Sequence, residues 1–70
     1  MKLKDIRFGH RNLDILMKFC DGFAPTWEVY VRWPGYKNRK YFTMIPAWNR
    51  LPSEVKEIVK LRIDKKLDIK

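Results

Sequence analysis

The sequence contains little of the chemistry on which disulfide scaffolds, metal sites and enzymes depend. A single cysteine, Cys20, excludes a disulfide within one chain, so the core must hold without a cross-link. One cysteine and one histidine, His10, also exclude the usual four-ligand zinc site in one chain. The only serine, Ser53, belongs to no Ser/His/Asp arrangement, and no Cys/His spacing stands out. We therefore expect a non-catalytic protein without metal or cofactor, with His10 on the surface and Cys20 packed as a small apolar side chain.

Closely spaced glycines and long hydrophobic runs are missing as well. The three glycines lie too far apart to form a loop that cradles phosphate; they are Gly9, Gly22 and Gly35. No apolar run approaches the roughly 18 residues of a membrane helix, and residues 1–5 lack the apolar stretch of a signal peptide. We expect no membrane partner and a cytoplasmic location, or a nucleoid or nuclear one if the partner is nucleic acid.

The chain is nevertheless rich enough in apolar residues to fold. Its 70 residues are 46% hydrophobic and 14% aromatic, too apolar for a disordered tail. A chain of this length buries only about 60% of the surface that its unfolded form exposes. The sequence therefore predicts a single small basic domain over residues 1–70.

Positive charge and aromatic residues gather in the middle of the sequence. Sixteen Lys and Arg against eight Asp and Glu give a net charge of +8, and no acidic residue lies between Glu28 and Glu54. All tryptophans and tyrosines lie between Trp27 and Trp48, interleaved with basic residues. This pattern points to the central segment as the working surface.

A helix is predicted from Pro52 to the C-terminal residues. Proline suits the first helical position, where its missing N–H costs nothing, and acidic residues in the next turns suit the positive end of the helix dipole. Apolar residues then recur at helical spacing; they are Val55, Ile58, Val59 and Ile63. The sequence thus predicts an amphipathic helix with one face on the core.

The centre of the chain predicts a β-hairpin. Residues 27–33 alternate between apolar and polar side chains, the period of a half-buried strand. Pro34 and Gly35 suit the two central positions of a turn, and residues 41–45 form a second strand that Pro46 ends.

The N-terminal third fits two structures. Leu13, Ile15, Met17 and Phe19 alternate as in a strand, whereas the spacing of Leu13, Leu16, Met17 and Cys20 fits a helix over residues 12–21. A strand is favoured, because a two-stranded ribbon with one helix makes a thin domain; residues 2–8 would add a short edge strand. The expected fold is α+β, a small antiparallel sheet of about three strands packed against one C-terminal amphipathic helix.

Basic residues interleaved with aromatic ones favour nucleic-acid binding. Lysine and arginine neutralise phosphates and release counterions, and exposed tyrosines stack on unpaired bases. The predicted contacts are Arg32, Lys37, Arg39, Lys40 and Arg50, with Tyr30 and Tyr36 as stacking or packing residues. We expect recognition of the phosphate backbone, with DNA preferred to RNA as partner, by a monomer or a homodimer.

The segment from Val29 to Tyr36 resembles the second strand of chromodomains, whose pattern is apolar-x-apolar-basic-Trp-x-Gly-Tyr. The strand–strand–helix order is similar too. The resemblance implies an aromatic cage for a methylated lysine, held by cation–π contacts. Its walls would be Trp33, Tyr36 and Phe8.

A third function class is also compatible with the sequence. Very small basic proteins without catalytic residues are often encoded by phages or mobile elements and act as inhibitors or adaptors of a host protein. An acidic surface on such a partner would satisfy the charge as well as nucleic acid does. Trp48, just before the helix, and Leu61, off its apolar stripe, are the expected anchors of that interface.

Overall fold

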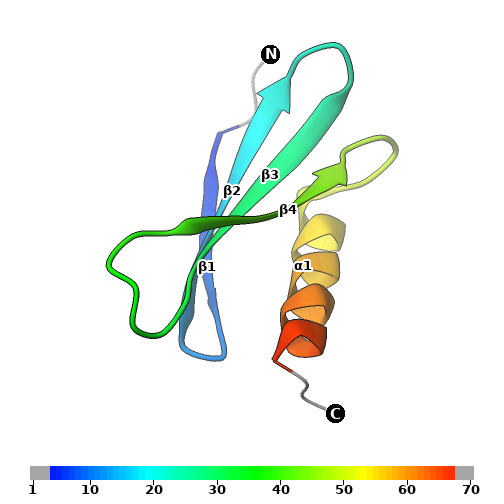
Figure 1. Cartoon of the computed structure of the whole chain (residues 1–70). Coiled ribbons are helices and arrows are strands. Elements are labelled where there is room, and N and C mark those ends of the chain that lie inside the picture. The colour runs from blue at the N-terminus through cyan, green and yellow to red at the C-terminus, as the bar shows by residue number, and fades with distance from the viewer. Residues whose placement is uncertain (1–3, 68–70) are drawn as a thin grey trace.

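Residues 4–67 fold as one four-stranded antiparallel sheet with a single C-terminal helix (Figure 1). This computed structural model describes residues 4–67. The strands follow one another in the sheet in chain order, β1-β2-β3-β4. Their bounds, and those of the helix, are β1 Ile6–His10, β2 Leu13–Asp21, β3 Pro25–Arg32, β4 Lys40–Pro46 and α1 Pro52–Lys66. The α+β architecture is as predicted, with four strands in place of about three.

The additional strand comes from a tight hairpin between β1 and β2. Arg11 and Asn12 connect the paired residues His10 and Leu13, and both have positive φ, 52° and 63°. Positive φ at both central residues is the geometry that twists with the flanking strands in a two-residue hairpin. The expected edge strand at residues 2–8 is found at Ile6–His10; residues 2 and 3 lie outside the described part. The 12–21 segment is a strand rather than a helix.

The central hairpin has the predicted alternation and turn. Trp27, Val29 and Val31 of β3 are buried, and the residues between them are less so. Tyr36 donates its backbone N–H to the carbonyl of Trp33 at 3.1 Å, and Gly35 between them has a φ of 87°. Only glycine accepts this conformation easily, as a type II turn requires.

A bulge in β4 brings one more aromatic residue to the core. Val29 pairs with Thr43 but Tyr30 pairs with Tyr41, so Phe42 is the extra residue. Phe42 is partly buried and meets Trp33 edge to face, with ring centroids 5.4 Å apart. The two rings close one end of the core.

The helix covers one face of the sheet. It begins at Pro52, and Val55, Val59 and Ile63 are fully buried against the strands. Arg62 donates a hydrogen bond to Thr43 Oγ1 at 2.6 Å, which ties the helix to β4. The buried core combines these three residues with the inward residues of three strands; those are Leu13, Ile15, Met17, Trp27, Val29, Val31 and Ile45.

The opposite face of the sheet, here called the open face, carries no helix in residues 4–67. Successive side chains of a strand point to opposite faces, so the residues between the buried ones lie on the open face.

Over residues 4–67, no helix has the length and hydropathy needed to cross a bilayer.

Candidate nucleic-acid interface

The open face carries ordered rows of side chains across the sheet. Arg7 of β1 pairs with Leu16 of β2, Leu16 with Tyr30 of β3, and Tyr30 with Tyr41 of β4. The four residues therefore form one continuous row. In the next row Asp14 stands directly opposite Arg32.

Basic residues surround a hollow of about 200 Å³ beside the Asp14–Arg32 pair. The residues that line this basic hollow are Arg7, Asp14, Arg32, Lys37, Asn38 and Arg39. Three come from strands, and the other three from the loop between β3 and β4. Four cationic groups thus share one carboxylate, which leaves an excess of positive charge at one point of the surface.

Asp14 fixes two of these cations. Arg39 Nη2 lies 3.1 Å from Asp14 Oδ2, and Arg7 Nη2 lies 3.9 Å from the same oxygen. Arg32 and Lys37 form no ion pair with any side chain of residues 4–67. The Nε atom of Arg39 is buried and has no hydrogen-bond partner in that range. The side chains of Arg32 and Lys37 therefore leave unused donors and charge in the hollow.

A second hollow of about 310 Å³ adjoins the first and has an aromatic floor. The residues that line this aromatic hollow are Leu16, Lys18, Tyr30, Asn38 and Arg39. The Tyr30 hydroxyl donates to Glu28 Oε1 at 3.0 Å, and this hydrogen bond is the main reason that the pKa of Tyr30 is raised above its ordinary value. Tyr41 meets the ring edge to face at 5.8 Å. The hydrogen bond and the edge-to-face contact therefore orient the Tyr30 ring.

The structure brings together part of the predicted nucleic-acid contacts. Arg32, Lys37 and Arg39 line the basic hollow, and Tyr30 lines the hollow beside it. Lys40 and Tyr36 line neither; the ammonium of Lys40 lies 5.8 Å from the Tyr36 ring centroid, and Tyr36 is exposed.

Arg50 lies apart from the other predicted contacts. It follows β4 and donates to the carbonyl of Pro46 at 3.0 Å. Pro46 pairs with Thr26 at one end of β3, whereas Arg32 ends that strand. At about 3.3 Å per residue, this separation approaches 20 Å.

The three predicted cage residues already have intramolecular contacts. Phe8 is on the helix side of the sheet, packed against the core, and the ammonium of Lys56 lies 5.7 Å from its ring. Trp33 packs on Phe42, and Tyr36 has Lys40 beside it. Lysines of the chain itself thus lie beside two of the three rings, and the aromatic cage stays a prediction from the sequence.

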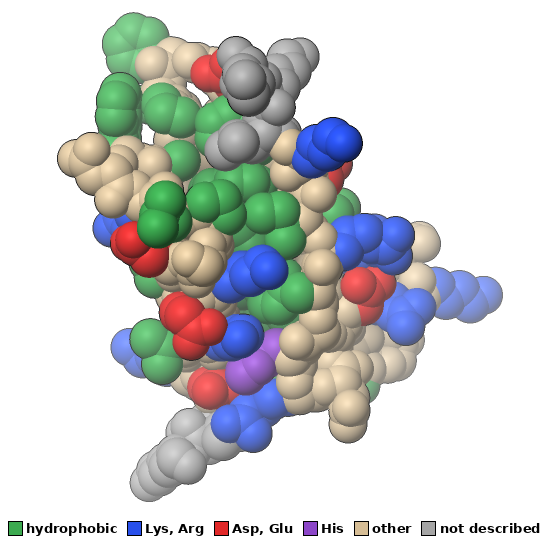
Figure 2. Space-filling view, turned by 180° about the vertical axis from the view of Figure 1, so that it is seen from behind, with side chains coloured by type: hydrophobic (Ala, Val, Ile, Leu, Met, Phe, Trp, Pro, Cys, Tyr) green, Lys and Arg blue, Asp and Glu red, His purple; other side chains and the backbone are tan. Residues whose placement is uncertain are grey.

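The two predicted protein-interface residues are both exposed, Trp48 by 61% and Leu61 by 69%. Trp48 belongs to a larger apolar end of the molecule. The backbone N–H of Ala47 donates to the carbonyl of Pro25 at 2.9 Å, which joins the β4–α1 loop to the end of the β2–β3 turn. Figure 2 shows hydrophobic side chains gathered at this end.

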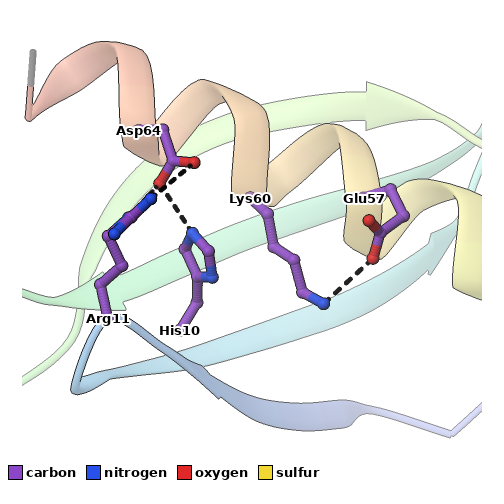
Figure 3. Close-up of polar contacts among 5 residues, drawn as sticks. All are labelled: His10, Arg11, Glu57, Lys60 and Asp64. Atoms are coloured by element: carbon purple, nitrogen blue, oxygen red, sulfur yellow. Dashed lines mark hydrogen bonds and ion pairs between the residues drawn. The ribbon is translucent and has the colours of Figure 1, made fainter. Parts of the chain in front are cut away.

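His10 is tied to the helix instead of standing free on the surface. Its Nε2 lies 2.7 Å from Asp64 Oδ1, and Arg11 Nε donates to the same oxygen at 2.7 Å (Figure 3). These hydrogen bonds, that of Arg11 first, lower the pKa of Asp64 below its ordinary value. The cluster joins the β1–β2 turn to the last turns of α1. It serves the fold rather than the open face.

Sequence reasoning missed several residues of the two hollows. Arg7, Asp14, Leu16 and Lys18 belong to β1 and β2, the segment whose structure the sequence left ambiguous. The available signal was the strand alternation, which places Asp14, Leu16 and Lys18 on the face opposite Ile15 and Met17. Their position beside Arg32 and Tyr30 depends on strand register, which local pattern does not give.

Comparisons with protein-family models, with curated proteins and with solved structures found no match for this chain. Among residues 4–67, no three His, Cys, Asp or Glu side chains lie close enough together to hold a metal ion. The two hollows and their charge are therefore the basis for a functional proposal.

Proposed function

We propose that the protein binds nucleic acid, without catalysing a reaction, through phosphate contacts on the open face of its sheet. The observation that carries the proposal is the basic hollow, in which Arg7, Arg32, Lys37 and Arg39 share the single carboxylate of Asp14. Cations gathered this closely repel one another unless an anion is bound. A phosphate supplies that anion, and the planar fork of arginine matches its oxygens.

Affinity from phosphate contacts is sensitive to salt, because binding releases counterions from the nucleic acid. Fluorescence anisotropy with labelled duplex DNA, single-stranded DNA and RNA from about 50 to 200 mM salt tests the proposal. Four phosphate contacts predict a slope of log K against log salt of about −3 to −4. Absence of binding, or a slope near zero, would overturn it.

A host-protein inhibitor or adaptor is the second candidate, and the apolar end favours it. Phe23, Trp48 and Leu51 are all well exposed there, and clustered aromatic residues are typical anchors of protein interfaces. Trp48→Ala separates the two functions. If nucleic acid is the partner, this variant keeps its affinity for it, because Trp48 lines neither hollow. If wild type binds no nucleic acid and Trp48→Ala loses a protein partner that Tyr36→Ala retains, the second candidate takes its place.

A further inference from the structure

We propose that the open face binds an unpaired nucleotide of DNA or RNA, with its phosphate in the basic hollow and its base in the aromatic hollow. This inference rests on the proposed function and adds to it the strandedness of the ligand and the place of the base.

The two hollows are neighbours at the spacing of one nucleotide. They share Asn38 and Arg39 as a common wall. Their floors are consecutive rows of the sheet, Asp14 with Arg32 and Leu16 with Tyr30. Residues two apart on one strand face lie about 7 Å from each other, a span comparable to that from the phosphate through the sugar to the base.

The basic hollow offers hydrogen-bond donors that the protein does not use itself. Arg32 and Lys37 form no ion pair within residues 4–67, and Arg39 is held in place by Asp14 at 3.1 Å. The Asp14 carboxylate repels a phosphate, but it faces four cations. The balance is attractive, and the held guanidinium loses little freedom on binding.

The aromatic hollow offers the side chain of Leu16 and the ring of Tyr30 beside that charge. Leu16 and Tyr30 form a cross-strand pair, and the hydrogen bond from Tyr30 to Glu28 fixes the ring. Lys18 stands at the ring face, its ammonium 6.0 Å from the centroid, on an exposed side chain that is free to move aside. A base stacked on such a ring contributes affinity with little sequence preference.

These features select an unpaired base. In a duplex the bases are stacked and paired, so a base reaches a pocket only by leaving the stack, at a cost of a few kcal/mol. In a single strand the base is free to turn toward the protein while its phosphate stays in the basic hollow. The Asn38 side chain, at the boundary of both hollows, carries donors and an acceptor that can reach a base edge.

The test compares three labelled 12-nucleotide ligands by anisotropy: a thymine single strand, the same strand with abasic sites in place of the bases, and a matched duplex. The abasic strand keeps every phosphate, so the affinity ratio of thymine to abasic strand isolates the base. We expect this ratio to be about tenfold or more, and the duplex to bind more weakly than the thymine strand. A uridine strand of RNA and a deoxyuridine strand of DNA carry the same base on different sugars. Tighter binding of either one supports the proposal and identifies the preferred sugar.

Tyrosine variants locate the base. Tyr30→Leu replaces the ring with an aliphatic side chain and should reduce the ratio to near one, while Tyr30→Phe should preserve it. The matched control is Tyr36→Leu, which removes an exposed tyrosine that lines neither hollow and should leave the ratio unchanged. Circular dichroism and the urea midpoint confirm that each variant is folded.

The failures of the two proposals are distinguishable. Equal, salt-dependent binding of thymine and abasic strands would overturn the base site while the phosphate proposal stands. Tighter binding of the duplex, or loss of the ratio in Tyr36→Leu instead of Tyr30→Leu, would overturn it as well. Absence of binding to all ligands would overturn both proposals.

Discussion

Arg39 lies against Asp14, with Nη2 of the guanidinium 3.1 Å from Oδ2 of the carboxylate. The pair joins the loop after β3 to the second strand, across residues far apart in the sequence. Arg39 Nε is buried and has no hydrogen-bond partner in residues 4–67, so the contact with Asp14 is what holds the guanidinium in place. Asp14 thus positions a donor at the wall that the basic and aromatic hollows share.

Arg39→Ala is expected to weaken nucleic-acid binding much more than Arg50→Ala. The first change removes a charged hydrogen-bond donor from both hollows, an interaction worth about 1.5–3 kcal/mol. The second removes the same charge at the far end of β3, where Arg50 caps the Pro46 carbonyl. Dissociation constants measured at one fixed salt concentration compare the two. Equal losses would mean that net charge, and not the hollow, determines affinity.

Acid should weaken the fold partly through Asp64. Its pKa is lowered by hydrogen bonds from Arg11 and His10, so the carboxylate is more acidic in the folded chain than its ordinary value near 3.8. A lowered folded pKa stabilises the protein above the unfolded value, and this contribution is lost as the pH falls through the folded pKa.

Asp64→Asn checks that expectation. The variant should melt below wild type at pH 7, and the gap should narrow as the pH falls below about 4. Thermal unfolding, followed by circular dichroism at pH 7 and at a pH below about 4, measures the difference in melting temperature between the variant and wild type. A difference that is constant with pH would contradict an electrostatic role for the cluster.

The three tryptophans should differ strongly in their effect on stability. Trp27 is 1% exposed and meets Phe19 edge to face at 5.1 Å, so Trp27→Ala should cost about 3–5 kcal/mol. That cost is comparable with the whole stability of a 70-residue domain. Trp33→Ala should cost less because Trp33 is partly buried, and Trp48→Ala should cost little because Trp48 is exposed. Urea unfolding measures the free energy of unfolding of each variant. A larger loss of this free energy in Trp33→Ala than in Trp27→Ala would be inconsistent with the fold.

Cys20 should be a slow thiol at neutral pH. Desolvation, followed by interactions with Glu28, raises its pKa above the ordinary value near 9.0, and the thiolate is the reactive form. Reaction with a disulfide reagent should be slower in the folded protein than in urea, and Glu28→Gln should accelerate it. Because the chain has one cysteine, the absorbance change reports this site alone. A thiol that reacts faster in the folded protein than in urea would contradict a raised pKa of Cys20.

The elements with strong local signals were predictable from the sequence. Period-two alternation marked β3, the Pro34–Gly35 pair marked its turn, and Pro52 marked the start of α1. The hairpin between β1 and β2 was harder, because Arg11 and Asn12 replace the Asn-Gly or Asp-Gly pair that usually announces such a turn. Without that turn, a separate β1 had no clear boundary.

The candidate site was predictable only where one segment supplied it. Lys37 and Arg39 are close in sequence, so their charge was visible in one short segment. Asp14 and Arg32 meet because β2 and β3 pair in one particular register, and a shift of one residue between the strands would put the two side chains on opposite faces of the sheet. The separation of Arg50 from Arg32 depends in turn on the pairing of β3 with β4.

The most direct test of the phosphate-binding proposal is the salt dependence of binding for two matched double variants. Arg32→Ala with Lys37→Ala removes two charges from the basic hollow, and Lys65→Ala with Lys66→Ala removes two from the exposed end of α1. The first pair should lower affinity for single-stranded DNA and reduce the salt slope by about 1.4, and the second should change neither appreciably. Equal slopes for the two variants would show that no defined phosphate site exists on the open face.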